Sequence, residues 1–421
     1  MFAKSVLENG IRVLSEEIPG SRSVSLGIWV ENGSRHEVAS KNGISHFIEH
    51  LLFKGTERRS AARIAEEMDS VGGVLNAFTG KEYTCYYAKV LDENLPLAVD
   101  LLTDIFLHSI FDPEEIERER TVILQEISQV EDTPDDYVHE LFNLDFFRDH
   151  ALGRPICGQA ATVLSFQRDD FINFWNDRYL PSRVIVAAAG HLRHQELVKQ
   201  LGETLGKADI ARFKGEDNDA APDGRPSRQS GVFKHHKPLE QAHLCLGMDG
   251  VPQAHPQRYA VYVLNAILGG GMSSRLFQEI REKRGKVYSI YSFQSAYHDI
   301  GYLGVYAGTS VEWVAEVTEL IVKEMRRIAD GDLKEDEVER ARNQLVGSLS
   351  LGLETSDAWM GHIAKNEIYF ARPVSLDEIA RGIRAVSRAE VVELANALFQ
   401  PRSMALTILG DLEKKDLDIR L

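Results

Sequence analysis

The chain has 421 residues, more than one hydrophobic core usually organises, so at least two domains are expected. With 43% hydrophobic and 27% charged residues, the composition is that of a packed globular protein and excludes a disordered or fibrous chain. The formal net charge of -16 disfavours binding to nucleic acid or to an anionic membrane surface, because both repel a negative protein.

The sequence shows no signal for a membrane or for secretion. No apolar run approaches the roughly 18 residues of a membrane span, and residues 1–14 lack the apolar stretch of a secretory signal. The three cysteines, Cys85, Cys157 and Cys245, lie far apart and form no CxxC pair, which argues against a disulfide framework. We expect a cytoplasmic bacterial protein rather than one of an organelle matrix, because no Arg-rich transit segment precedes the first strand.

The first strand signal is the alternation of apolar residues in 24–30, and a second strand-rich region follows at 74–90. Helical patterns separate them, without the regular βαβ rhythm of a parallel sheet. These patterns predict an α+β fold with a mostly antiparallel sheet that helices back on one face.

Residues 44–53 read ISHFIEHLLF and form an amphipathic helix. Its other face carries His46, Glu49 and His50, an HxxEH pattern. Histidines at i and i+4 project from successive turns on one side, so both imidazoles can reach one tetrahedral Zn²⁺. The alternative is a pair of helix-face histidines without a metal.

A second unusual helix is predicted from Asp112 and Pro113, an N-cap and first-turn pair, to about residue 130. Its apolar stripe contains Ile116, Ile123, Ile127 and Val130. Glu119 and Glu126 fall on the same stripe, two turns apart. A carboxylate within an apolar face is costly unless it is paired or binds a metal.

A zinc ion would satisfy this requirement. We assign Glu126 as the third ligand and Glu119 as a residue that hydrogen-bonds to a ligand histidine. The alternative is a buried ion pair with Arg118 or Arg120.

Three protein ligands leave a fourth position for water, which is typical of catalytic zinc and disfavours a purely structural zinc site. Glu49 would then serve as the general base that takes a proton from the metal-activated water during attack on a carbonyl. The sequence thus predicts a zinc-dependent peptidase.

The chain contains an internal repeat, since residues 170–192 align with 390–412 at a constant offset of 220. Between the copies, residues 213–231 are polar and lack periodicity, as a linker would. We therefore expect a catalytic domain at 1–212 and a homologous C-terminal domain at 232–421.

Residues 46–56 (HFIEHLLFKGT) and 117–127 (ERERTVILQEI) resemble the pitrilysin and mitochondrial processing peptidase family of HxxEH zinc metallopeptidases, specifically its short two-domain bacterial type. In that family a liganding glutamate of a longer acidic helix follows the motif at a similar distance, and here Glu126 follows His50 by 76. The resemblance implies two similar domains, each a mostly antiparallel sheet backed by helices, and endopeptidase activity on peptides or unfolded segments.

Residues 269–288 resemble the family segment that carries an arginine and a tyrosine seven residues apart, here Arg281 and Tyr288. The resemblance implies that both act in catalysis, by stabilising the oxyanion or holding the substrate main chain. The alternative is a solvated arginine and a core tyrosine of a strand at 287–293.

Residues 75–84 resemble the edge strand on which family members lay the substrate. By that resemblance Asn76, Ala77 and Thr79 would bind an extended peptide as an added strand, with Asn76 positioning it. The alternative is an ordinary asparagine at the start of a strand.

The second half repeats the zinc helix at 259–268 without histidine or glutamate, so we expect one Zn²⁺ per chain. From the resemblance we expect a homodimer in which Arg281 and Tyr288 complete the partner's site, or a heterodimer with an inactive homologue. The rival function is a non-catalytic assembly or binding subunit of the same fold.

Overall fold

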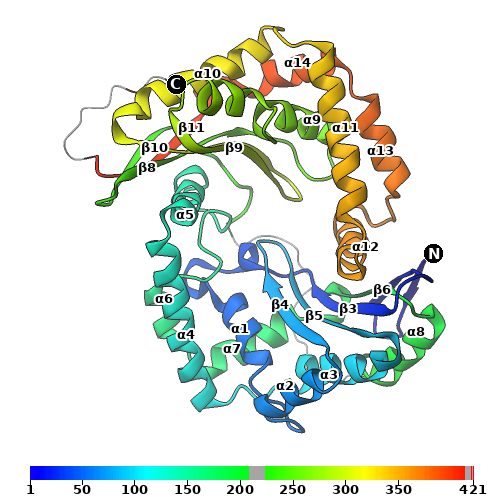
Figure 1. Ribbon diagram of the computed structural model, residues 1–421. Helices are drawn as coiled ribbons and strands as arrows, with labels where there is room; N and C mark the ends of the chain where they lie inside the picture. The colour runs from blue at the N-terminus through cyan, green and yellow to red at the C-terminus, as the bar shows by residue number, and fades with distance from the viewer. Residues whose placement is uncertain (208–222, 413–418, 420) are drawn as a thin grey trace. The chain divides into compact units, whose positions relative to one another are not determined.

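The computed structural model describes residues 1–207, 223–412, 419 and 421, and the chain divides into two compact units (Figure 1). Unit 1 consists of Met1–Gln129, Arg154–Gly224 and Gly352–Val374. Unit 2 consists of Val130–Gly153, Arg225–Leu351 and Ser375–Leu421. Most of the predicted linker lies outside the described residues, and the predicted domain boundaries stay predictions.

Unit 1 is built on a six-stranded sheet with the order β1-β2-β6-β3-β5-β4. Only β2 and β6 are parallel neighbours, and the other pairs are antiparallel. Its strands are β1 (Phe2–Val6), β2 (Arg12–Glu17), β3 (Ser23–Val30), β4 (Val74–Thr79), β5 (Thr84–Leu91) and β6 (Val184–Gly190). The strands predicted at 24–30 and within 74–90 are therefore confirmed.

Helices cover both faces of this sheet. Its helices are α1 (Ile44–Leu52), α2 (Ala61–Asp69), α3 (Leu95–His108), α4 (Pro113–Asp132), α6 (Ala160–Ser165), α7 (Arg168–Arg178), α8 (His194–Glu203) and α12 (Ser356–Phe370). One face forms the main core of the unit with α1, α3, α4 and α7. The other face packs against α12 through a smaller core.

Unit 2 repeats the plan with a five-stranded sheet of order β7-β11-β8-β10-β9, in which only β7 and β11 are parallel. Its strands are β7 (Gly231–His236), β8 (Gln241–Asp249), β9 (Val287–Ala296), β10 (Gly301–Ser310) and β11 (Ala405–Gly410). Its helices are α5 (Pro134–Phe146), α9 (Arg258–Gly269), α10 (Val314–Ala329), α11 (Glu335–Gly352), α13 (Leu376–Ala385) and α14 (Arg388–Leu398). Together with unit 1, this confirms the predicted α+β fold of two related domains.

Short helical turns connect these elements. They are η1 (Ser34–His36), η2 (Ala39–Lys41), η3 (Asp92–Asn94), η4 (Pro181–Arg183), η5 (Leu205–Lys207), the π-helical η7 (Phe277–Glu282), η8 (Val311–Trp313) and η9 (Pro401–Ser403). Within the described ranges, no helix has both the length and the apolar character that crossing a bilayer would require.

The internal repeat has matching structure in the two units. Helix α7 and helix α14 start and end at the same offset as the sequence repeat, and each leads through a short turn into an interior strand of its sheet, β6 or β11. Both helices begin with a capping box, in which Asp170 accepts from the Gln167 backbone and Glu390 accepts from the Ser387 backbone. The same local signals therefore produce the same helix-to-strand unit twice.

Each sheet receives one helix from the other half of the sequence. Helix α12 packs on the unit 1 sheet, and α5 packs on the unit 2 sheet through Phe142 and its neighbours. Glycines admit these helices at equivalent positions of the repeat: a methyl group at Gly27 would lie 2.9 Å from the Met360 sulfur, and one at Gly247 would lie 2.1 Å from the Phe142 ring. The expectation of a single helix-covered face was wrong, because the second layer comes from remote sequence.

Replacing Gly247 with alanine should lower the midpoint of urea-induced unfolding, because overpacking a core typically costs about 1–3 kcal/mol. Combined with Phe142→Ala, it should cost clearly less than the sum of the two single changes, since removing the ring creates room for the methyl group. Gly361→Ala on α12 is the control, because a methyl group there meets nothing within 4 Å. If Gly247→Ala proves as harmless as this control, the close contact with Phe142 is not a constraint.

Candidate metal centre

Helix α1 is fixed at its N-terminus by a buried acid. The Glu37 carboxylate is fully buried and accepts backbone hydrogen bonds from Gly43 at 2.8 Å and Ser45 at 2.9 Å. Burial raises the pKa of Glu37, and these donors oppose the shift. The apolar face of the helix is buried in the core, through Ile44, Phe47, Ile48, Leu51 and Leu52. Cap and core together set the direction in which the remaining face points.

That face meets α4, the helix predicted from Asp112 and Pro113. Glu126 Oε2 lies 3.8 Å from His46 Nε2 and 3.6 Å from His50 Nε2, and one ligand atom from each of the three residues lies within 4.8 Å of the others. Ligands of a tetrahedral zinc ion, bound at about 2.0–2.1 Å, are roughly 3.3 Å apart. Both distances to Glu126 are close to that spacing, and two imidazoles and a carboxylate are donors that zinc prefers, so the three residues fit a zinc ion.

Glu119 orients one of these histidines. Its Oε2 accepts from His50 Nδ1 at 2.9 Å, and its Oε1 accepts from Lys54 Nζ at 2.7 Å. Burial opposes ionisation of Glu119, but the hydrogen bonds from His50 and Lys54 outweigh it and lower the pKa of the carboxyl group. With Nδ1 of His50 engaged, the Nε2 lone pair is directed toward Glu126. The contact expected between Glu119 and a histidine is present.

His46 and His50 differ in their surroundings. Burial and the neighbouring His50 lower the pKa of His46 to about 4, so His46 is neutral at physiological pH. Burial also acts to lower the pKa of His50, but its hydrogen bond to Glu119 and the charge of Glu126 raise it overall. Within the described part of the chain, His46 Nδ1 is buried without a hydrogen-bond partner. Among the described residues, His50 Nδ1 is therefore held by a carboxylate, whereas His46 Nδ1 is not.

Glu49 lies beside this group and is not one of the three converging residues. Burial raises its pKa, and its Oε2 accepts a hydrogen bond from Thr79 Oγ1 of β4. The sequence predicts a substrate contact for Thr79 and gives no sign of this bond to Glu49. A half-buried carboxylate with a raised pKa has the property that a general base and acid near neutral pH requires.

The alternative partners proposed for the glutamates of α4 are wrong. Arg118 bonds to Glu115, and Arg120 bonds to Glu117 and to the backbone carbonyl of Phe166. The expectation that both glutamates lie within an apolar face holds only for the first. Glu119 is 7% exposed and Glu126 is 38% exposed, so the Glu126 position opens toward solvent.

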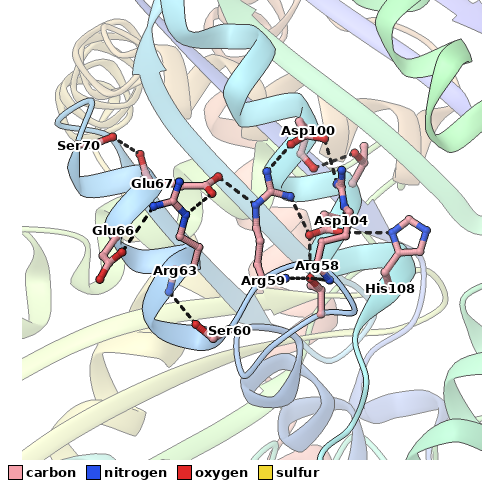
Figure 2. Close-up of polar contacts among 12 residues, drawn as sticks. Arg58, Arg59, Ser60, Arg63, Glu66, Glu67, Ser70, Asp100, Asp104 and His108 are labelled. Atoms are coloured by element: carbon pink, nitrogen blue, oxygen red, sulfur yellow. Dashed lines mark hydrogen bonds and ion pairs between the residues drawn. The ribbon is translucent and has the colours of Figure 1, made fainter.

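The loop after α1 is anchored on Asp104 of α3, which is fully buried. Figure 2 shows Arg58, Arg59 and His108 directed at its carboxylate, with N···O distances of 2.9, 2.8 and 3.2 Å. Thr56 Oγ1 donates to it at 2.8 Å. This network could not be predicted from the sequence, because arginines and aspartates so far apart in the chain carry no local pattern.

Strand β4 is the outermost strand of the unit 1 sheet and, among the described residues, pairs only with β5. It carries Asn76, Ala77 and Thr79, and the Asn76 side-chain oxygen accepts from the Ala77 backbone N–H at 2.8 Å. This local bond is also compatible with the alternative, in which Asn76 is an ordinary strand residue. The strand position agrees with the expected edge, and the role in substrate binding stays a prediction.

Arg281 and Tyr288 lie close together in unit 2. The Arg281 guanidinium carbon is 4.7 Å from the Phe277 ring centroid and 5.8 Å from that of Tyr288, within reach of cation–π attraction. Tyr288 is 79% exposed on β9, so the alternative of a core tyrosine is wrong. Both side chains are available to a ligand, although their catalytic role stays a prediction.

Comparison with known proteins identifies the family. Residues 12–160 match the domain family described as Insulinase (Peptidase family M16), and residues 165–345 match the Peptidase M16 inactive domain. This chain belongs to peptidase family M16. It is 41% identical to an uncharacterized zinc protease of Bacillus subtilis over 95% of this chain and 96% of that one. It is 42% identical to one of Streptomyces coelicolor over 98% of this chain and 90% of that one.

Solved structures agree with the fold of an M16 protein. A protease from Helicobacter pylori superposes with a TM-score of 0.90 at 22% identity, covering 97% of this chain and 99% of that one. A structure from Pseudomonas fluorescens, described as a peptidase M16 inactive domain, gives 0.89 at 18% identity and covers 99% of this chain and all of that one. The resemblance seen in the sequence is thereby confirmed at the level of family and fold.

Replacing Asp104 with asparagine should lower the free energy of unfolding by about 3 kcal/mol, because a neutral amide at this fully buried position weakens the charge-assisted hydrogen bonds from Arg58 and Arg59 and the bond from Thr56. Asp100→Asn is the matched control: Asp100 also bonds to Arg58 and Arg59 but is 41% exposed, so its loss should cost less than about 1 kcal/mol. Urea denaturation of both variants measures the difference. If the two variants lose equal free energy of unfolding, Asp104 is not the residue that anchors the loop after α1.

The effect of Asp104→Asn should depend on pH. The hydrogen bonds from Arg59, Thr56 and Arg58 outweigh burial and lower the pKa of Asp104 in the folded state. The contribution of the ionised Asp104 carboxylate to the free energy of unfolding is therefore complete above the unfolded-state pKa of about 4. It is lost as pH falls through the folded-state pKa. The stability difference between the wild type and Asp104→Asn should persist from pH 7 to about pH 4 and shrink below it.

Proposed function

We propose that this M16 protein is a zinc-dependent endopeptidase that hydrolyses peptides or unfolded protein segments. The convergence of His46, His50 and Glu126, with the half-buried carboxylate of Glu49 beside them, carries the proposal. Three protein ligands leave an open coordination position, as catalytic zinc sites do. We propose one zinc ion per chain, because α9, the counterpart of α1, has neither histidine nor glutamate.

A zinc ion held by the three ligands would supply a Lewis acid that polarises the scissile carbonyl and acidifies a water molecule. Glu49 accepts a proton from the water as its oxygen adds to the carbonyl carbon. The same carboxyl group then gives the proton to the leaving amine nitrogen as the C–N bond breaks. The hydrogen bond from Thr79 fixes the Glu49 carboxylate, and Glu119 orients His50.

We propose that the substrate binds in extended form along the outer edge of β4. Main-chain hydrogen bonds to such an edge give affinity with little demand on sequence, which suits unfolded segments. Asn76, Ala77 and Thr79 would contact this peptide. Arg281 and Tyr288 would hold its main chain or stabilise the oxyanion, and their mutual stacking supports a joint role.

Glu49→Gln should keep zinc but lower the cleavage rate by about a thousandfold, because the amide cannot accept the proton. The assay incubates each variant with a mixed peptide library, with and without chelator, and identifies cut sites by mass spectrometry. Glu57→Gln, an exposed acid in the loop after α1, is the control and should keep full activity.

Two results would contradict the proposal. Appreciable cleavage by zinc-loaded Glu49→Gln would remove Glu49 from the role of base. Wild-type protein that binds zinc but cleaves no peptide would favour the non-catalytic assembly or binding subunit.

We further propose a homodimer in which Arg281 and Tyr288 of each chain complete the site of the other. An intact metal-binding trio and an intact Arg/Tyr pair in the same chain support this over a heterodimer with an inactive homologue. We place the protein in the bacterial cytoplasm, since the buried Cys85 and Cys245 form no disulfide among the described residues and the relatives named above are bacterial.

Complementation tests the homodimer. His46→Ala and Tyr288→Phe chains should each be inactive, whereas an equimolar mixture after subunit exchange should regain about a quarter of wild-type activity. Half of the dimers are then mixed, and each has one intact site of two. Mixed dimers as inactive as either parent would exclude completion by the partner.

A further inference from the structure

The carboxylate that orients His50 depends on a second charged residue. Glu119 is almost fully buried, and each of its oxygens has one charged or polar donor: His50 on Oε2 and Lys54 on Oε1. A buried carboxylate that loses a donor keeps its desolvation cost without compensation. It then rotates toward other donors, and this rotation removes the fixed direction of its bond to His50.

The position of Lys54 is itself fixed by its neighbours in the chain. Its backbone N–H donates to the carbonyl of Leu51 at 3.0 Å, which continues the last turn of α1. The next residues are held by the Gly55 carbonyl, which accepts from Ile110 at 3.3 Å, and by the Thr56 hydroxyl on the buried Asp104. Lys54 is therefore presented to Glu119 by an anchored loop.

We propose that Lys54 is a positioning residue for the zinc ligand His50 and acts through Glu119. This inference rests on the proposed zinc site. Lys54 holds one Glu119 oxygen, so the other stays aimed at His50 Nδ1, and His50 keeps the tautomer whose Nε2 lone pair binds metal. His46 has no comparable support in the described part of the chain, so the Lys54–Glu119 pair is the main control on imidazole orientation at this site.

Coulomb repulsion between Lys54 and a bound cation would act in the opposite direction, because removing a positive charge favours cation binding. Whether zinc affinity falls or rises when Lys54 is replaced therefore distinguishes orientation of His50 from repulsion of the cation. Lys54 contacts the Glu119 oxygen that His50 does not use, and its side chain is 31% exposed. Solvent screens such a charge strongly. We expect orientation to dominate and zinc affinity to fall when Lys54 is replaced.

The test is the zinc dissociation constant of purified full-length protein, measured by competition with a chelating dye. Lys54→Met keeps the length of the side chain but cannot donate, and it should raise the constant about tenfold, as loss of a partner of a ligand histidine does. Lys54→Arg should restore most of the affinity. Lys89→Met is the matched control, since Lys89 pairs with Asp357 at 2.6 Å and is 36% exposed. It should leave the constant unchanged.

A double-mutant cycle tests the route through Glu119. Glu119→Gln alone should weaken zinc binding, and adding Lys54→Met to it should cause no further loss. An equal additional loss in that background would overturn the proposal, as would a Lys54→Met protein that binds zinc like Lys89→Met. Urea denaturation of the metal-free variants separates unfolding from loss of orientation. A wild type that binds no zinc would instead overturn the proposed function, and this inference with it.

Discussion

The candidate site depends on holding two imidazoles and a carboxylate of two helices, α1 and α4, within bonding range of one point. Without the surrounding structure this arrangement is unfavourable, because it removes polar groups from water. Buried acids at defined positions offset the cost. Glu37 caps the first turn of α1, Glu119 holds His50, and Asp104 anchors the loop after the helix. Each carboxylate receives charged or backbone donors, so α1 is fixed at both ends.

The two units use one plan for different purposes. The α7–β6 and α14–β11 segments match at the offset of the sequence repeat, and Gly27 and Gly247 make room for an incoming helix at equivalent positions. Yet α1 carries the candidate metal-binding face, whereas its counterpart α9 has neither histidine nor glutamate. The two copies thus share their packing, whereas the three converging metal-ligand candidates lie in the first copy and Arg281 and Tyr288 lie in the second.

Local periodicity was sufficient to predict much of this structure. The apolar stripe of α1 fixes which face carries His46 and His50, and the stripe of α4 placed Glu119 and Glu126 on the side that faces them. The repeat and its strand and helix pattern were likewise visible in the sequence. The exposure of Glu126 was not, because periodicity assigns a residue to a face of the helix and does not say how fully neighbouring elements cover that face.

Contacts between remote segments could not be predicted in this way. The exchange of α5 and α12 places helices on sheets built from the other half of the chain, and the helices look ordinary in the sequence. The bonds of Thr79 to Glu49 and of Thr56 to Asp104 join residues 30 to 48 positions apart. No spacing rule links such pairs, since only the folded sheet and its loops bring them together.

Diffraction from crystals of the zinc-loaded protein, recorded at the zinc absorption edge, tests the central claim most directly. One anomalous peak per chain is expected, within about 2.0–2.2 Å of Nε2 of His46, Nε2 of His50 and a carboxylate oxygen of Glu126. A peak at other residues, or none at this site under saturating zinc, would contradict it.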